Sequence, residues 1–253
     1  MFLRATKAAL LAIAALPACV SLRSDTASQP PSRMDRLPRV TLWAWERSEN
    51  LSPADPALFA IAYLDQTLTI GLTVQAHPRR DPIIFAANAT RIPVVRIETA
   101  RHALLDAETR SEAIQAILLS ARSPGIGALQ VDFDATRSQR EWYRELIVEL
   151  RREMPPQLPL SITALASWCS YDDWVRGLPV DEAVPMFFRM EPARRRAPAD
   201  FADFQMREPL CRDSVGVSTG EPWPTRVLGK RIYIFSDHGW RKDLTVRFKR
   251  RVQ

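Results

Sequence analysis

The stretch Ala128-Leu-Gln-Val-Asp-Phe-Asp134 carries the pattern that decides the fold. It is typical of a short buried strand, and a helical pattern follows it from Ser138 to about Met154. Side chains two positions apart on a strand share a face, so we expect Gln130, Asp132 and Asp134 to point together. The intervening apolar residues then face a covering helix. The segment predicts one strand–helix unit of a parallel sheet.

Strand and helix patterns alternate on both sides of this unit. Most of the expected strands are followed by a helix or a helical turn, which favours a parallel sheet. A count of eight predicts a compact (β/α)8 barrel of the TIM type, with an open doubly wound α/β sheet as the alternative. The eight expected strands are Val40–Trp45, Phe59–Leu64, Arg91–Glu98, Ala128–Asp134, Leu160–Leu165, Ala183–Arg189, Val215–Ser218 and Arg231–Phe235.

Two features extend this simple alternation. Residues 67–76 alternate like an additional strand, so we expect a β insertion near residues 67–90. An amphipathic helix is expected over residues 108–122. Shorter helical stretches are expected near residues 172–176, 199–206 and 239–247.

The first residues have the pattern of an export signal. Arg4 and Lys7 precede an apolar run that ends in Leu16-Pro-Ala-Cys19, and the run is too short to span a membrane. Its ending resembles the lipobox of bacterial lipoproteins, in which the cysteine becomes the lipidated first residue. The resemblance implies a lipidated Cys19 and a membrane-anchored lipoprotein, expected at the outer membrane and facing the periplasm. An ordinary cleaved signal is the alternative.

These patterns predict the domain organisation. We expect a signal peptide at residues 1–18, a lipidated cysteine and flexible tether at 19–38, and a single barrel domain at 39–253. Cys169 and Cys211 remain in the exported chain. Because two is the number that pairs in an oxidising compartment, we expect a disulfide rather than free thiols or a zinc site.

Composition excludes several classes of protein. The 253 residues are 46% hydrophobic and 25% charged, which is ordinary for a globular chain. The formal net charge is +6, and loss of Arg4 and Lys7 with the signal leaves 6 − 2 = +4. The arginines are scattered, so we expect no nucleic-acid partner. With eight glycines and three widely spaced histidines, we expect neither a cofactor nor a metal.

Carboxylates at the strand ends are the candidate catalytic residues. Active sites of barrel enzymes lie at the C-terminal ends of the strands, and a polar strand face is costly unless it is bonded or used. We select Asp132, Asp134 and Glu98. Arg96 is expected to hold one carboxylate ionised while a second, with a raised pKa, serves as an acid. The alternative is that one aspartate caps the next helix and the other pairs with a basic neighbour.

Aromatic and polar residues near the same strand ends are candidate contacts for a sugar. Tryptophan faces suit sugar rings, although single tryptophans most often simply pack. The candidate substrate-binding residues are Trp45, Arg96, Trp168, Arg189 and Glu221. The G-x-S-x-G pattern at residues 216–220 is not expected to be a nucleophile elbow, because Pro222 and Pro224 follow where a helix is required.

Several stretches resemble the bacterial domain-of-unknown-function family 3142 over roughly residues 40–240. They are Leu42–Glu46, Val94–Glu98, Leu129–Ala135, Leu160–Cys169, Leu178–Met186 and Val215–Thr219. More remotely, Asp132-Phe-Asp134 resembles the D-x-D-x-E signature of chitinase-like glycoside hydrolases, with Thr136 where that signature has its glutamate. The resemblance implies a glycoside-hydrolase-like barrel, and Thr136 argues against substrate-assisted chitinase chemistry.

Two functions follow as the main hypotheses, and a third is an assembly partner that uses its basic surface in an envelope complex. Of the main two, one is a polysaccharide-active hydrolase, with Asp134 or Glu98 as the acid and Asp132 positioning or stabilising charge. The other is a non-catalytic glycan-binding or structural envelope lipoprotein. Both imply a carbohydrate or cell-envelope glycan as partner, a membrane contact through Cys19, and a monomer. Carboxyl groups about 5 to 9.5 Å apart across an open mouth favour hydrolysis, whereas carboxylates consumed by an arginine favour binding or a structural role.

Overall fold

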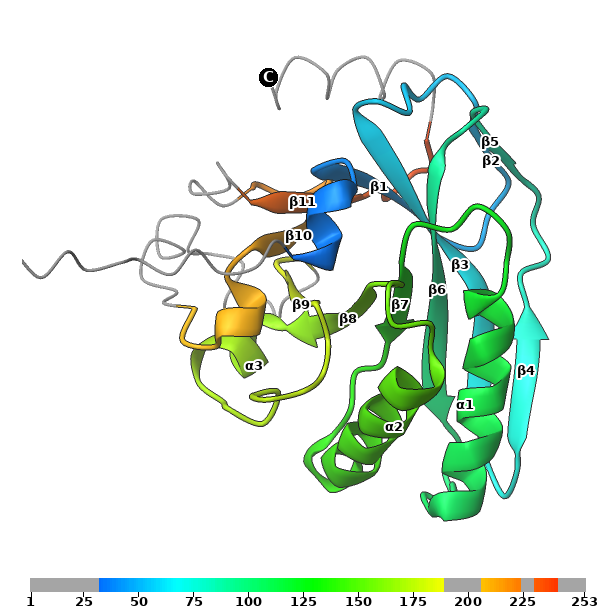
Figure 1. Cartoon of the computed structure of the whole chain (residues 1–253), viewed down its shortest axis with the longest axis vertical. Coiled ribbons are helices and arrows are strands. Elements are labelled where there is room, and N and C mark those ends of the chain that lie inside the picture. The colour runs from blue at the N-terminus through cyan, green and yellow to red at the C-terminus, as the bar shows by residue number, and fades with distance from the viewer. Residues whose placement is uncertain (1–31, 189–205, 224–229, 241–253) are drawn as a thin grey trace, which may run out of the picture. The chain divides into compact units, whose positions relative to one another are not determined.

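A closed barrel of eight parallel strands forms the centre of the protein. The structure, a computed structural model, describes residues 32–188, 206–223 and 230–240. The ring order is β1-β11-β10-β9-β8-β7-β6-β3, and β3 pairs back to β1 (Figure 1). The strands are β1 (Val40–Ala44), β3 (Phe59–Ile70), β6 (Thr90–Thr99), β7 (Leu129–Asp132), β8 (Leu160–Leu165), β9 (Glu182–Met186), β10 (Ser214–Ser218) and β11 (Arg231–Phe235).

The closure of this ring confirms the TIM-type prediction and excludes the open sheet. In an open sheet one strand at each end has an unpaired edge, whereas here Val40 of β1 pairs with both Ile232 and Phe59. The closing pairs are parallel on both sides. All eight strands therefore end at the same rim of the barrel, where the active sites of this fold are built.

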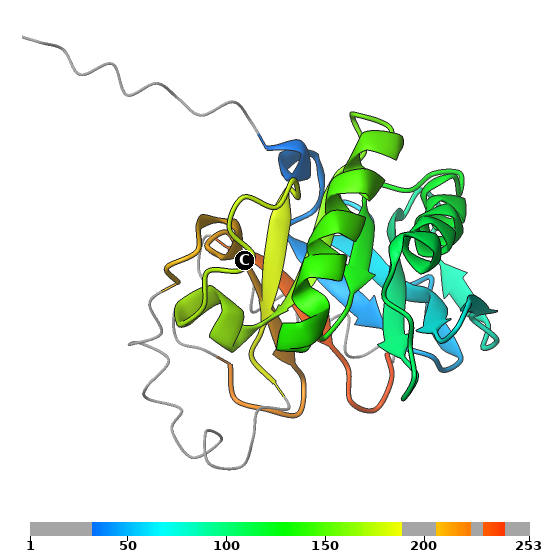
Figure 2. The ribbon, with the colours of Figure 1, turned by 90° about the horizontal axis from the view of Figure 1, so that it is seen from below.

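Helices cover one side of the barrel. α1 (Ala107–Ala121) and α2 (Arg140–Glu153) follow β6 and β7, and Figure 2 shows both on the outside of the strands. Asp106 caps the start of α1, and its carboxylate accepts a hydrogen bond of 2.9 Å from the backbone of Thr109. The remaining described helices are the short η1 (Arg33–Arg36), η2 (Arg137–Gln139), α3 (Ala166–Ser170) and η4 (Pro209–Cys211).

Of the three short helices that the sequence predicts, the structure fully describes only the first. Residues 172–176 form a turn rather than a helix, because the helical turn comes earlier, in α3. Residues 199–205 and 241–247 lie outside the described residues.

The β insertion is present, but its first strand is not separate. β3 continues to Ile70, beyond a register shift between Leu64 and Gln66, and its second half pairs with the end of β6. β4 (Val74–Pro78) then returns antiparallel to it, and β5 (Ile83–Phe85) pairs with β2 (Glu49–Leu51). The bulge at the shift lets one strand serve both the barrel and the insertion.

The apolar residues of β7 pack outward, as the alternation predicts. Phe133, which follows β7, meets Trp142 and Tyr143 of α2 edge-on, with ring centroids 6.3 and 5.2 Å apart. Val131 and Phe133 are buried in the same outer core. This burial fixes the opposite face of β7, which carries Gln130 and Asp132, towards the barrel interior.

A buried polar network crosses the barrel interior near the N-terminal ends of the strands. Glu182 accepts hydrogen bonds from Ser161, at 3.0 Å, and from Tyr233, and its other oxygen lies 3.5 Å from Arg231. Tyr233 and Glu182 stand on β11 and β9, with β10 between them, so their contact passes through the barrel. Burial raises the pKa of Glu182, and the bonds from Tyr233 and the charge of Arg231 oppose that rise.

The N-terminal end of the barrel is closed by η1. Met34 is 3% exposed, and Arg231 donates hydrogen bonds to the backbone oxygens of Met34, Leu37 and Pro38. The compact unit begins at Ser32. The last residues of the expected tether therefore belong to the barrel, because the apolar side chains of Met34 and Leu37 are buried against it.

The predicted disulfide between Cys169 and Cys211 is confirmed, with Cα atoms 5.8 Å apart. Cys169 lies after β8 and Cys211 before β10. They meet because the chain before η4 returns to α3, where the carbonyl of Cys169 accepts hydrogen bonds from the backbone of Arg207 and Glu208, at 2.9 and 3.2 Å. Among the residues described, no helix has the length and apolarity that crossing a membrane requires.

Candidate functional site

A charged cluster stands at the C-terminal rim, between β6 and β7. Arg96 and Asp132 are register partners, and a guanidinium nitrogen lies 3.0 Å from the Asp132 carboxylate. The Nε of Arg96 donates to Glu98 at 2.8 Å. Thr163 of β8 donates to the second Asp132 oxygen at 2.6 Å. We call Arg96, Glu98, Asp132 and Thr163 the rim cluster.

Arg96 is the one basic residue of the rim cluster, and both of its carboxylates pair with it. Partial burial alone would lower the pKa of Arg96, but the carboxylates of Asp132 and Glu98 outweigh it and raise that pKa, so the guanidinium stays charged. The Asp132 side chain is 6% exposed, and both its oxygens accept a hydrogen bond. The Asp132 carboxylate is therefore fixed in position at the rim.

Asp134 stands apart from these pairings. It follows the end of β7, is exposed to solvent, and has no hydrogen bond or ion pair among the described residues. Neighbouring atoms that displace its water raise its pKa, the Asp132 charge raises it further, and Arg96 opposes both. The two aspartates of the D-x-D pattern thus have different environments. Asp132 is paired with Arg96, whereas Asp134 has no such partner among the described residues.

Aromatic rings lie beside the rim cluster. The Arg96 guanidinium lies 5.2 Å from the centroid of the half-buried Trp45 ring. Trp45 contacts Trp43 and Phe235 edge-on, with centroids 6.1 and 6.4 Å apart, and Phe188 stacks on Phe235 at 5.4 Å. The Nε1 of Trp43 is buried without a hydrogen-bond partner in the described part of the chain. The rim thus combines an aromatic wall with fixed charge.

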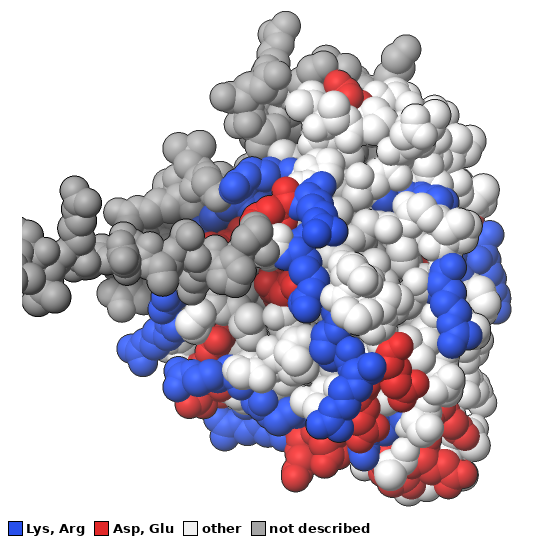
Figure 3. Space-filling model, in the orientation of Figure 1, with Lys and Arg blue, Asp and Glu red and all other residues white. Residues whose placement is uncertain are grey.

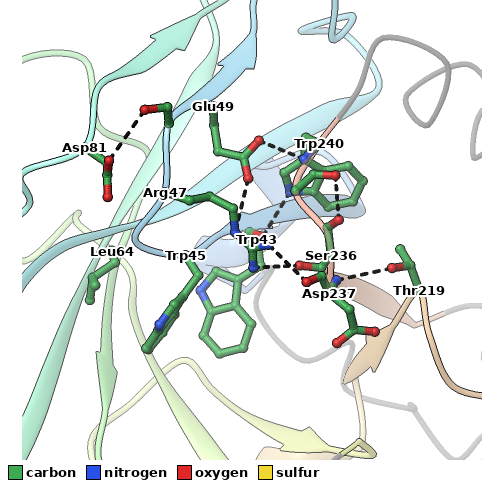
Figure 4. A network of polar contacts seen from close by, with 12 residues as sticks. Trp43, Trp45, Arg47, Glu49, Leu64, Asp81, Thr219, Ser236, Asp237 and Trp240 are labelled. Carbon is green, nitrogen blue, oxygen red and sulfur yellow. Dashed lines mark hydrogen bonds and ion pairs between the residues drawn. The ribbon is translucent and has the colours of Figure 1, made fainter.

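The loop that carries Trp45 is held by two arginines, Arg79 and Arg47, of which Figure 4 labels Arg47. Arg79 donates to the carbonyl of Trp45 at 2.7 Å and also to the carbonyl of Arg47. Arg47 in turn donates to the carbonyls of Ser236 and Asp237, at 3.1 and 3.0 Å, and so ties β1 to the end of β11. The sequence does not predict this role of Arg79, since backbone carbonyl partners leave no pattern in the sequence.

The structure brings only some of the predicted site residues together. Arg96, Glu98, Asp132, Asp134 and Trp45 meet at the rim between β1, β6 and β7. Glu221 lies in the turn after β10, at the same end of the barrel. Arg189 and Cys19 lie outside the described residues.

Trp168 is not part of the rim, contrary to expectation. It is 2% exposed in the outer core, where its ring meets Trp174 edge-on at 4.7 Å. α3 begins directly after β8 and turns the side chain outward, so strand-end position alone was misleading. In the G-x-S-x-G pattern, Ser218 is 1% exposed and donates to Asp237 at 2.5 Å, which agrees with rejecting a nucleophile elbow.

The fold and the site define a TIM-type barrel with a carboxylate–arginine cluster at its strand ends. Within that class, residues 88–184 match the model of the family described as Domain of unknown function (DUF3142). The predicted family resemblance is confirmed over these residues, which include the rim cluster and Asp134. No curated protein matches the chain.

One solved structure with a similar arrangement is that of the Bacillus cereus spore cortex-lytic enzyme SleL. It is 15% identical, with a TM-score of 0.49, over 71% of this chain and 50% of its own. The chain thus spans about half the length of that protein.

Proposed function

We propose that the protein is a glycoside-hydrolase-like envelope lipoprotein that acts on a polysaccharide at the barrel rim, with Asp134 as the acid. The difference between Asp132 and Asp134 carries this proposal. Glycoside hydrolysis needs one carboxyl group that can protonate the leaving oxygen and a second that stabilises positive charge on the sugar. Asp134 is unpaired with a raised pKa, and Asp132 is held in place by Arg96 and Thr163.

Glu98 is the weaker candidate for the acid. Its carboxylate accepts a hydrogen bond of 2.8 Å from the Nε of Arg96 and is already paired. An acid needs a carboxyl group that can reach the leaving oxygen of the substrate, so the unpaired Asp134 fits the role better than Glu98. Asp132 lies too deep and is too fully bonded to donate a proton, which leaves it the role of stabilising charge.

Trp45 supports a sugar as the ligand. Its half-buried ring lies beside the rim cluster, and its backbone is fixed by Arg79. A ring held in this way loses little conformational entropy when a sugar stacks on it. Trp45 would orient the substrate over the two aspartates.

The test compares the exported protein with its Asp134→Asn variant on envelope and secreted polysaccharides, with new reducing ends as the readout. We expect the variant to lose at least about 100-fold in rate. Because the acid must be protonated, the rate should fall as the pH rises through the pKa of Asp134. Glu141→Gln, at an exposed carboxylate on α2, is the matched control and should leave the rate unchanged. Equal rates in the wild type and Asp134→Asn would refute the role of Asp134.

Non-catalytic glycan binding is the second candidate. The pairing of Arg96 with both Asp132 and Glu98 favours it, because two of the three candidate catalytic carboxylates are then already in ion pairs. In that case the wild-type protein releases no product, yet binds a glycan with an affinity that Asp134→Asn does not change. Calorimetric titration with the same polysaccharides separates the two candidates.

We further propose that the protein is a monomer anchored at the outer membrane through Cys19 and faces the periplasm. The Leu16–Cys19 pattern supports the anchor, and Val20 is not the aspartate that marks inner-membrane retention. Cys19→Ala should abolish labelling by a radioactive fatty acid, whereas Cys211→Ser should leave labelling intact. Labelling that persists in Cys19→Ala would contradict the anchor.

A further inference from the structure

The N-terminal end of the barrel, opposite the rim cluster, carries an excess of basic residues. They lie in η1, at or just before the starts of strands, and at or just after the ends of helices, and we call this surface the basal face. Figure 3 shows Lys and Arg side chains gathered over η1. The basic residues of the basal face are Arg33, Arg36, Arg39, Arg91, Arg122, Arg151, Arg152, Arg212 and Lys230, against the acidic residues Asp35, Glu153, Asp181 and Asp213.

The basal face is hollowed beside η1. A cavity of about 920 Å³ is lined there by Arg33, Arg36 and Arg91 among polar and apolar neighbours. Arg91 is fixed by a hydrogen bond to the carbonyl of Pro124 and lies 5.5 Å from the centroid of the Phe85 ring. A fixed guanidinium at a concave, basic surface is suited to phosphate groups.

Part of this charge is free of internal partners. Arg33 pairs with Asp181 at 2.9 Å. In contrast, Arg36, Arg122 and Arg152 are exposed and make no side-chain hydrogen bond or ion pair within the described residues. Their charges remain available to an anionic surface outside the protein.

The chain enters the barrel at this same face. Ser32 caps η1 by accepting a hydrogen bond of 3.2 Å from the backbone of Met34. The expected anchor, Cys19, lies thirteen residues before Ser32 in the sequence, a distance of at most about 45 Å when fully extended. An anchor there would keep the barrel within about 45 Å of the bilayer, with the basal face at the point where the tether joins.

We propose that the basal face docks on the anionic phospholipid headgroups of a bilayer. The charge excess and the basic hollow support this partner, as does the entry point of the chain together with the proposed anchor. Each basic side chain near such a surface strengthens binding by about fivefold and acts only within about 10 Å, so the effect is lost in high salt. The inference is independent of the proposed glycan activity.

Vesicle co-sedimentation tests this docking without a lipid on the protein. The chain from residue 19, carrying Cys19→Ser, is mixed with phosphatidylcholine vesicles with and without 30% phosphatidylglycerol. The compact unit that contains the barrel begins at Ser32, so omitting the signal peptide leaves the barrel intact. We expect binding only to the anionic vesicles, and its loss in 0.5 M NaCl. Absence of binding to anionic vesicles at low salt would overturn the proposal.

A matched pair of triple variants separates the basal face from total charge. The basal variant is Arg36→Glu, Arg122→Glu and Arg152→Glu, and the control is Arg80→Glu, Arg101→Glu and Arg137→Glu, at exposed positions away from the basal face. Both change the net charge by the same amount. We expect at least tenfold weaker binding for the basal variant and less than threefold for the control. Equal weakening in both would overturn the proposal, and unchanged melting temperatures establish that both variants fold.

Discussion

Arg96 and Asp132 face each other on neighbouring strands, with a guanidinium nitrogen 3.0 Å from the carboxylate. The same guanidinium also holds Glu98 at 2.8 Å and lies 5.2 Å from the centroid of the Trp45 ring. One arginine thus connects two carboxylates and an aromatic ring at the mouth of the barrel. The positions of Asp132, Glu98 and Trp45 relative to one another therefore depend on Arg96.

Replacement of Arg96 by glutamine should lower the free energy of unfolding by about 2 kcal/mol, since it leaves the buried Asp132 without its cation. Asp132→Asn should recover most of that loss in the double variant. Urea unfolding of the four proteins in the mutant cycle measures the coupling. Arg137→Gln is the exposed control. Additive effects of Arg96→Gln and Asp132→Asn would show that the pair is not coupled.

Trp45→Ala should weaken glycan binding by about tenfold while lowering the free energy of unfolding by less than about 2 kcal/mol, because the ring is only half-buried. Trp45→Phe keeps an aromatic face and should restore part of the affinity. Calorimetry and urea unfolding give the two quantities. An affinity that is the same in Trp45→Ala and the wild type would exclude this ring from the binding site.

The disulfide should contribute about 3 to 4 kcal/mol to the free energy of unfolding, since it closes a loop across a sequence separation of 42. The double variant Cys169→Ser and Cys211→Ser removes it without leaving a single thiol. Denaturant unfolding of this variant should match that of the wild type in reductant. If thiol titration of the unreduced, unfolded wild type finds both cysteines free, the bond is absent in solution.

Burial raises the pKa of Glu182, so folding favours its protonated form. The protonated Glu182 side chain contributes fully to the free energy of unfolding below its ordinary pKa near 4.5. This contribution is lost as the pH rises through the higher pKa of the folded state. Glu182→Gln cannot ionise, so its free energy of unfolding should not show this decline. Denaturant unfolding from pH 4 to pH 8 gives the comparison, with the exposed Glu141→Gln as control. Parallel curves for the wild type and Glu182→Gln would contradict the shift.

The sequence predicts the barrel and the centre of the site well. Alternation along β6 and β7 defines which side chains share a face, and parallel neighbours end at the same rim. Those two rules suffice to predict the proximity of Arg96, Glu98 and Asp132.

Other features depend on contacts that local patterns do not encode. The burial of Met34 depends on Arg231, nearly two hundred residues later, and without that partner the segment is typical of a tether. Trp168 turns outward because α3 begins one residue after β8. The fixing of the Trp45 loop uses backbone carbonyls, which any residue type provides.

Pairing of β1 with β11 has a consequence for the order in which the chain folds. Val40 meets Ile232 in the closed ring, so the first strand lacks one neighbour until the last strand has been delivered. A chain that is made from its N-terminus must therefore keep that edge unpaired until almost all of it has been synthesised.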